Sequence, residues 1–317
     1  MSKYRTIVNI DGGKVLRSEM YKNRFVSYLI WRLILKQPRV RNLVTRLFIR
    51  DKNQWVKLLG ADVFINRRKE IGYWRASKRQ NGAVLLRDEV PSLLCITPIV
   101  SEASSFVDCG ANVGLFTAAM LPLKQIYPEL SFYTYEPNPE TFKRLSETLK
   151  GKPVTNENIA LSNKEGFLEM AIGSTSGVFG VGGGHFQIQR RAFKIPCRTL
   201  ASYELKGDRL FLKIDVEGHE LEVLQGAQQL FADNRVFAVL IDGARQEQEC
   251  LQFLERYQFT LLNVPYLEEY KRGDYRILGL KRRRVPDEQW SRPTLGTRAS
   301  ADIESKRSEE PHQLVKR

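Results

Sequence analysis

Residues 106–114 read Phe106-Val107-Asp108-Cys109-Gly110-Ala111-Asn112-Val113-Gly114, and they predict a buried strand, a glycine turn and the start of a helix. The strand opens with β-forming apolar residues and ends near the carboxylate of Asp108. Gly110 permits a tight turn and a close approach of the backbone to a ligand, and Gly114 lets the helix pack close to the strand. Open α/β sheets bind nucleotides at the first junction of this kind. We therefore expect a nucleotide-like ligand beside this turn.

Downstream of this turn, apolar runs alternate with amphipathic segments. The alternation predicts strands over 106–108, 132–135, 154–159, 210–215, 236–242, 259–264 and 275–280. It predicts helices over 113–127, 139–150, 220–231 and 246–257. This pattern is typical of an α/β fold, with a doubly wound, mostly parallel seven-stranded sheet. The short link between the last two strands favours an antiparallel hairpin at the sheet edge.

The remaining segments are expected to form an extension, an insertion and a tail. Residues 1–100 are predicted to be a basic, mainly helical N-terminal extension, with mostly helical spacing over 39–59 and a possible strand over 83–86. Residues 101–280 form the core domain. An insertion at about 166–205 should add strands over 167–172 and 193–197, around a glycine-rich stretch that is either a lid containing His185 or a surface loop. Residues 281–317 are polar and predicted to be a disordered C-terminal tail.

The chain of 317 residues has a net charge of +14, and the basic excess lies at its ends. Residues 1–100 contain 21 Lys and Arg against 7 Asp and Glu, whereas residues 101–280 contain 19 against 23. The basic segment 1–60 is either a solvated face or a weak contact for an anionic membrane surface. The longest apolar run, residues 25–35, is too short to cross a bilayer. The four cysteines lack metal-ligand spacing, which favours reduced thiols and a cytoplasmic protein.

The spacing of the glycine turn bears on the identity of the ligand. A dinucleotide fold has a third glycine between the outer two, but Asn112 stands there and argues against a close diphosphate. S-adenosylmethionine has no phosphate, and its amino acid head and ribose suit a carboxylate such as Asp108. Glu136 closes the second strand and is placed to accept both ribose hydroxyls. An NAD enzyme shares that acid, so Glu136 alone separates the two ligands weakly.

Four motifs in one order resemble the FkbM-type methyltransferase family: FVDCGANVGLFT (106–117), EPNP (136–139), NIALS (158–162) and LKIDVEGHELEVLQGA (212–227). The resemblance implies a class I, Rossmann-like methyltransferase with S-adenosylmethionine as donor, and transfer to a hydroxyl oxygen, often on a sugar or natural product. It implies that the cofactor-binding residues are Asp108, Gly110, Ala111, Asn112, Gly114, Glu136, Asn138, Asn158 and Ala160. Family members often have a glutamate at the end of the fifth strand, where this chain has Asp242.

Three candidate bases follow the fourth strand: Asp215, Glu217 and His219. An alcohol acceptor must lose its proton as the new bond forms, and we expect Asp215 to lie nearest the reacting centre. Glu217 is assigned to substrate positioning or proton removal, although acids at a helix start also stabilise the helix without any catalytic role. His219 titrates in a range that suits a base, and Lys213 is expected to support Asp215. No strong metal-ligand spacing is present, and no metal is expected.

The sequence thus predicts an S-adenosylmethionine-dependent O-methyltransferase that acts on a hydroxyl of a saccharide or sugar-containing small molecule. One alternative is an NAD-dependent oxidoreductase or epimerase, but no Tyr-x-x-x-Lys pair stands in a suitable place. A second alternative is a methyltransferase-like binding module that uses the basic N-terminal face for an anionic partner. We expect a small-molecule or glycan acceptor and no sequence-specific nucleic acid. The oligomeric state is left open.

Overall fold

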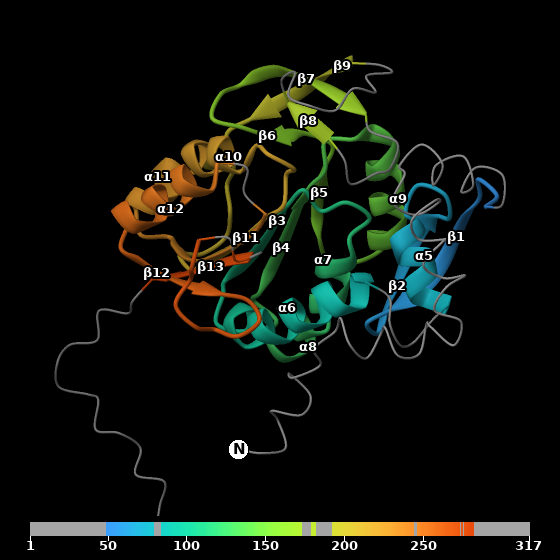
Figure 1. Cartoon of the computed structure of the whole chain (residues 1–317), viewed down its shortest axis with the longest axis horizontal. Coiled ribbons are helices and arrows are strands. Elements are labelled where there is room, and N and C mark those ends of the chain that lie inside the picture. The colour runs from blue at the N-terminus through green and yellow to red at the C-terminus, as the bar shows by residue number, and fades with distance from the viewer. Residues whose placement is uncertain are drawn as a thin grey trace, which may run out of the picture. The chain divides into compact units, whose positions relative to one another are not determined.

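A computed structural model of the chain describes residues 49–78, 84–172, 179–181, 192–243, 246–272, 274 and 276–281. Its centre is a mostly parallel sheet of seven strands in the order β12-β13-β11-β10-β3-β4-β5 (Figure 1). These strands are β3 (Ser105–Cys109), β4 (Ser131–Tyr135), β5 (Thr155–Glu157), β10 (Leu210–Ile214), β11 (Val236–Asp242), β12 (Phe259–Asn263) and β13 (Arg276–Lys281). Only β13 runs against its neighbours. The predicted seven-stranded sheet and its antiparallel hairpin are confirmed.

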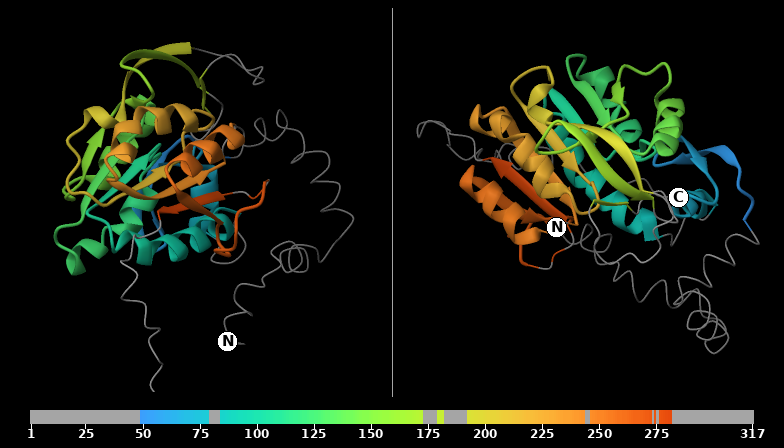
Figure 2. Two further views of the ribbon diagram at one scale, coloured as in Figure 1. Left: turned by 90° about the vertical axis from the view of Figure 1, so that its left-hand side faces the viewer. Right: turned by 90° about the horizontal axis from the view of Figure 1, so that it is seen from above.

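Hydrophobic clusters lie on both faces of this sheet, because successive residues of a strand point to opposite faces. On one face Val107 and Leu212 belong to a cluster with α10 (Glu220–Gly226), α11 (Gln228–Ala232) and α12 (Glu247–Arg256). Figure 2 shows these helices, in gold and orange, grouped beside the sheet. On the other face Phe106 and Phe211 belong to a cluster with α6 (Val84–Val100) and α7 (Leu115–Met120). The doubly wound order of the connections stays a prediction.

The N-terminal part of the described chain is a hairpin followed by a helix. Strands β1 (Asn53–Leu58) and β2 (Ala61–Asn66) pair antiparallel, and α5 (Ile71–Lys78) follows. The helical spacing predicted over 39–59 is therefore wrong for β1, where Val56 and Leu58 are buried at alternate positions and pack near the glycine turn. The strand predicted over 83–86 is also wrong, because α6 begins at Val84.

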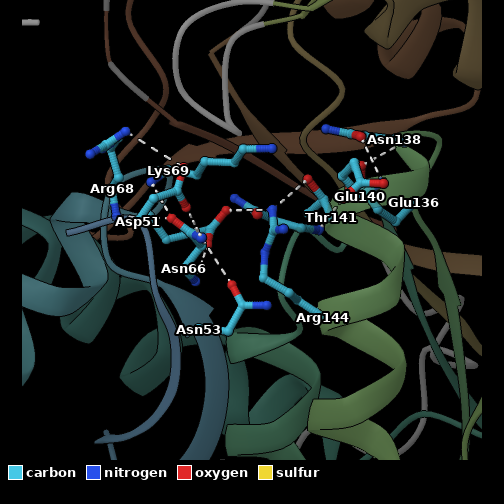
Figure 3. Close-up of polar contacts among 12 residues, drawn as sticks. Asp51, Asn53, Asn66, Arg68, Lys69, Glu136, Asn138, Glu140, Thr141 and Arg144 are labelled. Atoms are coloured by element: carbon cyan, nitrogen blue, oxygen red, sulfur yellow. Dashed lines mark hydrogen bonds and ion pairs between the residues drawn. The ribbon is translucent and has the colours of Figure 1, made fainter. Parts of the chain in front are cut away.

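A buried ion pair ties this hairpin to α9 (Pro139–Leu149). Arg144 Nη2 lies 2.8 Å from Glu70 Oε1, and the two side chains are only 5% and 0% exposed. Glu70 also accepts a hydrogen bond from the backbone N–H of Asn66. Figure 3 shows Arg144 reaching from α9 towards the end of β2, where Asn66 lies. The N-terminal hairpin is thus fixed to the helix that follows Glu136.

The insertion forms a second sheet of four strands, in the order β6-β9-β7-β8. They are β6 (Ala160–Leu161), β7 (Gly166–Ile172), β8 (Phe179–Val181) and β9 (Ala192–Arg198), followed by the 3-10 turn η2 (Leu200–Ser202). Both strands predicted in the insertion are confirmed. His185, most of the glycine-rich stretch, residues 1–48 and the tail from 282 lie outside the described residues, so the predictions made for them stay predictions.

Two predicted elements are shorter than expected. The helix predicted over 113–127 is divided into α7 and α8 (Leu123–Ile126), and Pro122 lies at the break, where it cannot donate a helical hydrogen bond. The strand predicted over 154–159 ends at Glu157, and the chain then crosses to the second sheet.

All four cysteines are free thiols, and three of them are buried. Within the described residues, no helix combines the length and apolar character needed to cross a membrane.

Candidate active site

The glycine turn joins three strand ends. The N–H groups of Gly110 and Ala111 donate to the carbonyl oxygen of Tyr135, at 2.9 and 3.1 Å, and so attach the turn to the end of β4. Gly110 has φ of +80°, and a Cβ there would overlap the carbonyl oxygen of Asp215 at the end of β10. Gly114 has φ of +84°, and its Cβ would lie 2.7 Å from Leu145 Cδ1. Packing within the protein therefore already requires both glycines.

Glu136 lies beside this turn at the end of β4. Its Oε2 accepts the N–H of Asn112 and its Oε1 accepts the N–H of Asn138, both at 2.9 Å. The side chain is almost fully buried, and burial raises the pKa of Glu136 to about 7 despite these two hydrogen bonds. Each carboxylate oxygen can accept a further hydrogen bond, so the residue keeps the capacity to bind ribose hydroxyls.

Asn112 contributes an unsatisfied polar atom to the turn. It adopts the left-handed conformation, with φ of +51°. In the described part of the chain, its buried side-chain oxygen Oδ1 has no hydrogen-bond partner. An unsatisfied buried polar atom costs about 1–3 kcal/mol, and a hydrogen-bond donor on a ligand would remove that cost. The position therefore fits a ligand that presents an ammonium or hydroxyl group.

Asn138 and Asn158 hold the loop that carries Glu136. The Asn138 side chain accepts the N–H of Glu140 and caps α9. Asn158 Nδ2 donates to the carbonyl oxygens of Glu136 and Pro137, at 2.8 and 3.0 Å. The contacts of both predicted cofactor-binding residues are thus with the protein's own backbone, and their direct contact with the cofactor stays a prediction.

A mainly apolar hollow opens between the glycine turn and the second sheet. It has an empty volume of about 330 Å³, solvent included. Its lining residues are Gly110, Tyr135, Pro137, Ile159, Ala160, Leu161, Leu168, Met170, Val216 and His219.

Asp108 is completely buried and has two partners within the protein. Lys213 Nζ lies 3.1 Å from Asp108 Oδ1, and the Thr117 hydroxyl donates to Oδ2 at 2.8 Å. Lys213 also lies 3.4 Å from Asp215 Oδ2, so one ammonium joins the ends of β3 and β10. Direct binding of the donor by Asp108 stays a prediction. The observed contacts support a positioning role, in which Asp108 holds Lys213.

Asp215 is the partly open member of this group, with a side chain that is 35% exposed. Burial raises its pKa; Lys213 opposes this rise, and the carboxylates of Asp242 and Asp108 add to it. Burial alone would lower the pKa of Lys213, but the charges of Asp108 and Asp215 outweigh it and raise the pKa. The ammonium is therefore held charged, as expected for a residue that supports Asp215.

Glu217 and His219 lie in different surroundings. Glu217 is exposed, with φ of +54°. His219 is buried, with Nε2 3.0 Å from the Ser162 hydroxyl and Nδ1 3.4 Å from Glu222 Oε2. Burial lowers the pKa of His219, which favours a neutral ring. These contacts support a structural role in the wall of the hollow, and the catalytic role of His219 stays a prediction.

A further charged group, formed by Arg276, Asp242 and Glu89, was not predicted from the sequence. It lies on the face of the sheet that α6 covers. Arg276 Nη2 is 2.6 Å from Asp242 Oδ2 and 3.2 Å from Glu89 Oε2. The charged Arg276 in an otherwise apolar strand segment was the available signal. Glu89 lies in the segment predicted as the N-terminal extension. Within the described residues, no group of three or more His, Cys, Asp and Glu side chains could hold a metal ion.

The family comparison gives this arrangement its identity. The family model described as the methyltransferase FkbM domain matches residues 108–263. The chain carries an FkbM methyltransferase domain. S-adenosylmethionine is its cofactor, and Asn112, Glu136 and the apolar hollow fit that molecule. Glu89 and Arg276 lie outside the matched part of the FkbM domain, although they contact Asp242 within it.

Comparison with curated proteins gave no match. Among solved structures, the FkbM chain resembles the ribosomal protein L11 methylase of Lactobacillus delbrueckii subsp. bulgaricus, with 15% identity over 62% of this chain and 80% of that one, and a TM-score of 0.36. It resembles a SAM-dependent O-methyltransferase of Thermotoga maritima, with 14% identity, coverage of 62% and 66%, and a TM-score of 0.35. A Pyrococcus abyssi tRNA (uracil-54, C5)-methyltransferase, solved with S-adenosyl-L-homocysteine, gives 9% identity, coverage of 72% and 43%, and a TM-score of 0.36. These scores are too low to carry an argument.

Proposed function

We propose that this methyltransferase transfers a methyl group to a hydroxyl oxygen of a saccharide or sugar-containing small molecule. The observation that carries the proposal is the position of Asp215. Its partly exposed carboxylate follows β10 directly, and the turn with Gly110 packs against its backbone. In open α/β sheets, ligands bind outside the carboxyl ends of the strands. This position supports a role for Asp215 beside the cofactor site, within reach of solvent.

The side chains of this site would have separate roles in binding the donor and orienting the acceptor. When bound, S-adenosylmethionine supplies an activated methyl group, so alignment is the main requirement and can contribute roughly 7–11 kcal/mol. Glu136 would accept hydrogen bonds from the ribose hydroxyls, and Asn112 Oδ1 would accept one from the donor. Asp215 would orient the acceptor by accepting a hydrogen bond from one of its hydroxyl groups, with Lys213 fixing the position of its carboxylate. Glu217 would contact the acceptor from the exposed side.

The acceptor class is supported by the type of group that lines this edge. Carboxylates accept hydrogen bonds from hydroxyl groups, and Asp215 and Glu217 both reach solvent there. The FkbM match favours methyl transfer over the NAD-dependent alternative. Contact of residues 1–60 with an anionic membrane surface is a separate proposal. Vesicle binding that fades with salt would support it, and binding by a chain that lacks residues 1–60 would contradict it.

Two measurements test the proposed function. Isothermal titration calorimetry should show that both S-adenosylmethionine and S-adenosylhomocysteine bind to the full chain. A screen of sugars and glycosides with labelled donor should then yield a methyl ether that mass spectrometry locates on oxygen. No binding of either ligand, or transfer to nitrogen or carbon alone, would refute the proposal.

The role of Asp215 has its own variant. Asp215→Asn should leave the affinity for S-adenosylhomocysteine within about threefold and lower kcat by roughly 100-fold, because a neutral amide orients the acceptor through weaker hydrogen bonds than a carboxylate does. The matched control is Glu255→Gln, an exposed position on α12 away from this edge. Wild-type turnover by Asp215→Asn would show that the assignment is wrong.

A further inference from the structure

Glu89 is fixed at the edge of the sheet by Arg276, which joins α6 to β13 and β11. It lies on α6, ahead of the family match, and its Oε2 is held by Arg276 of β13. Arg276 is itself buried and also bonds Asp242 at the end of β11 and Ser92 on α6. In the described part of the chain, the second oxygen of Glu89, Oε1, accepts no hydrogen bond. One oxygen of this carboxylate is therefore anchored and the other is available.

The charges around Glu89 do not balance. Two cations, Lys213 and Arg276, contact four carboxylates in this region. The carboxylates are those of Asp108, Asp215, Asp242 and Glu89. Among these described side chains two negative charges are in excess, and unpaired charges are costly when buried. A cationic ligand or a bound proton would reduce that excess of negative charge. The excess therefore suits a site that binds a cation or takes up a proton.

We propose that Glu89 is the group that accepts the proton of the acceptor hydroxyl during methyl transfer. This inference rests on the proposed function. In the step, the hydroxyl oxygen forms a bond to the methyl carbon, the carbon–sulfur bond breaks and its electron pair stays on sulfur. The hydroxyl proton passes to Glu89 Oε1. The sulfonium loses its positive charge as the glutamate loses its negative charge, so the total charge of the site does not change.

Glu89 suits this role better than its neighbours. The Asp215 carboxylate is bound by Lys213, and that of Asp242 lies closer to Arg276 than that of Glu89 does. The Glu89 side chain is 16% exposed, so it is not closed off from solvent. Burial raises the pKa of Glu89 to about 7, with Arg276 opposing the rise. A base is most effective when its pKa lies near the working pH.

Groups from each neighbouring element set this proton affinity. Arg276 on β13 and Lys213 on β10 favour the charged form of Glu89, whereas Asp242 on β11 and Asp215 after β10 oppose it. Tyr73 on α5 faces the same cluster, and its pKa is raised by burial and then by Glu89. The tyrosine therefore stays neutral. A bound sulfonium would add one more positive charge, lower the pKa of Glu89 and release a proton.

The experiment compares the number of protons released when S-adenosylmethionine binds with the number released when S-adenosylhomocysteine binds. Isothermal titration of the full chain at pH 7, in two buffers of different ionisation enthalpy, gives the protons released on binding. Both ligands make the same ribose contact with Glu136, and only S-adenosylmethionine carries the sulfonium charge. The wild type should release more protons with S-adenosylmethionine than with S-adenosylhomocysteine. Glu89→Gln should reduce this difference markedly, whereas the exposed control Glu255→Gln should keep it in full.

Each outcome decides between the two claims. If neither ligand binds to the wild type, the proposed function fails. If both bind but the wild type shows no difference, or Glu89→Gln keeps it, the inference about Glu89 fails alone. If Glu89→Gln does not fold, Glu89→Asp replaces it and should shift the pH of the largest difference by at least about half a pH unit. An unchanged pH would overturn the inference. With an identified acceptor, Glu89→Gln should also lose kcat without a matching change in KM.

Discussion

Lys213 lies directly opposite Asp108 in the parallel pair formed by β10 and β3, and its ammonium is 3.1 Å from Asp108 Oδ1. Both side chains are almost fully buried. Two charges removed from water in this way require each other, because an unpaired buried charge is far more costly than an apolar residue of the same size. The pair therefore fixes the ends of the two strands that frame the cofactor site.

Lys213→Met should destabilise the fold by about 3–5 kcal/mol, because it leaves the Asp108 carboxylate buried without its cation. Urea unfolding followed by circular dichroism measures this change. The control is Lys143→Met, where an exposed pair with Glu140 is lost and less than about 1 kcal/mol is expected. Adding Asp108→Asn to Lys213→Met should recover part of the loss. Equal effects of Lys213→Met and Lys143→Met would contradict the buried pair.

The affinity for S-adenosylhomocysteine should depend on pH through Glu136. Its pKa in the free protein is raised to about 7 by burial, so at pH 6 most of the carboxylate is protonated and loses part of its capacity to accept ribose hydroxyls. The dissociation constant should therefore be about tenfold higher at pH 6 than at pH 8. Calorimetry at the two pH values tests this. Glu136→Gln should bind S-adenosylhomocysteine weakly at both pH values. A wild-type dissociation constant that does not change with pH would contradict this prediction.

The contribution of Glu136 to the free energy of unfolding should fall as the pH rises, whereas the affinity for S-adenosylhomocysteine should increase. The folded-state pKa of Glu136 lies above the ordinary value of 4.5, because burial disfavours the charged form. Its contribution to stability is therefore complete below about pH 4.5 and is lost as the pH rises through about 7. Thermal unfolding of the wild type and Glu136→Gln between pH 5 and pH 8 would show this as a difference in melting temperature that changes with pH. A difference that stays constant would mean that Glu136 ionises as freely when folded as when unfolded.

Gly110→Ala and Gly72→Ala should have opposite effects. At Gly110 the backbone is left-handed and a Cβ overlaps the carbonyl of Asp215, so a loss of at least about 2 kcal/mol is expected. At Gly72, in α5, no atom lies within 4 Å of the added Cβ, and the higher helix propensity of alanine should add up to about 1 kcal/mol. Differential scanning calorimetry compares the two. Equal melting temperatures would disprove the close approach at Gly110.

Arg144→Met should separate the hairpin from α9. The change leaves Glu70 buried without its cation, and a loss of about 3–5 kcal/mol is expected. Lys150→Met, at an exposed pair just after the same helix, should cost less than about 1 kcal/mol. Hydrogen exchange should also accelerate in β1 and β2 of Arg144→Met. Unchanged exchange there would show that the apolar contacts of the hairpin hold it without the ion pair.

The core elements were predictable because their signals are local. The strand Val236–Asp242 was predicted with its observed bounds, and α9 was predicted to within one residue, since Pro139 suits the first turn of a helix. The error at β1 has an equally physical cause. Trp55, Val56 and Leu59 fit a helical spacing, whereas Val56 and Leu58 fit an alternating one. Only packing against residues near the glycine turn selects the strand.

The sequence by itself determined the strand–turn–helix at residues 106–114, the order of the core strands along the chain and the family, because these depend on residue type and short spacing. Tertiary structure alone decided which charges meet. Glu89 and Arg276 are 187 positions apart in the chain and are joined at one sheet edge, while the residues expected to bind the cofactor include Asn138 and Asn158, whose side chains are used to hold a loop. Charge pairing across such separations depends on strand order and helix packing, and no local pattern encodes it.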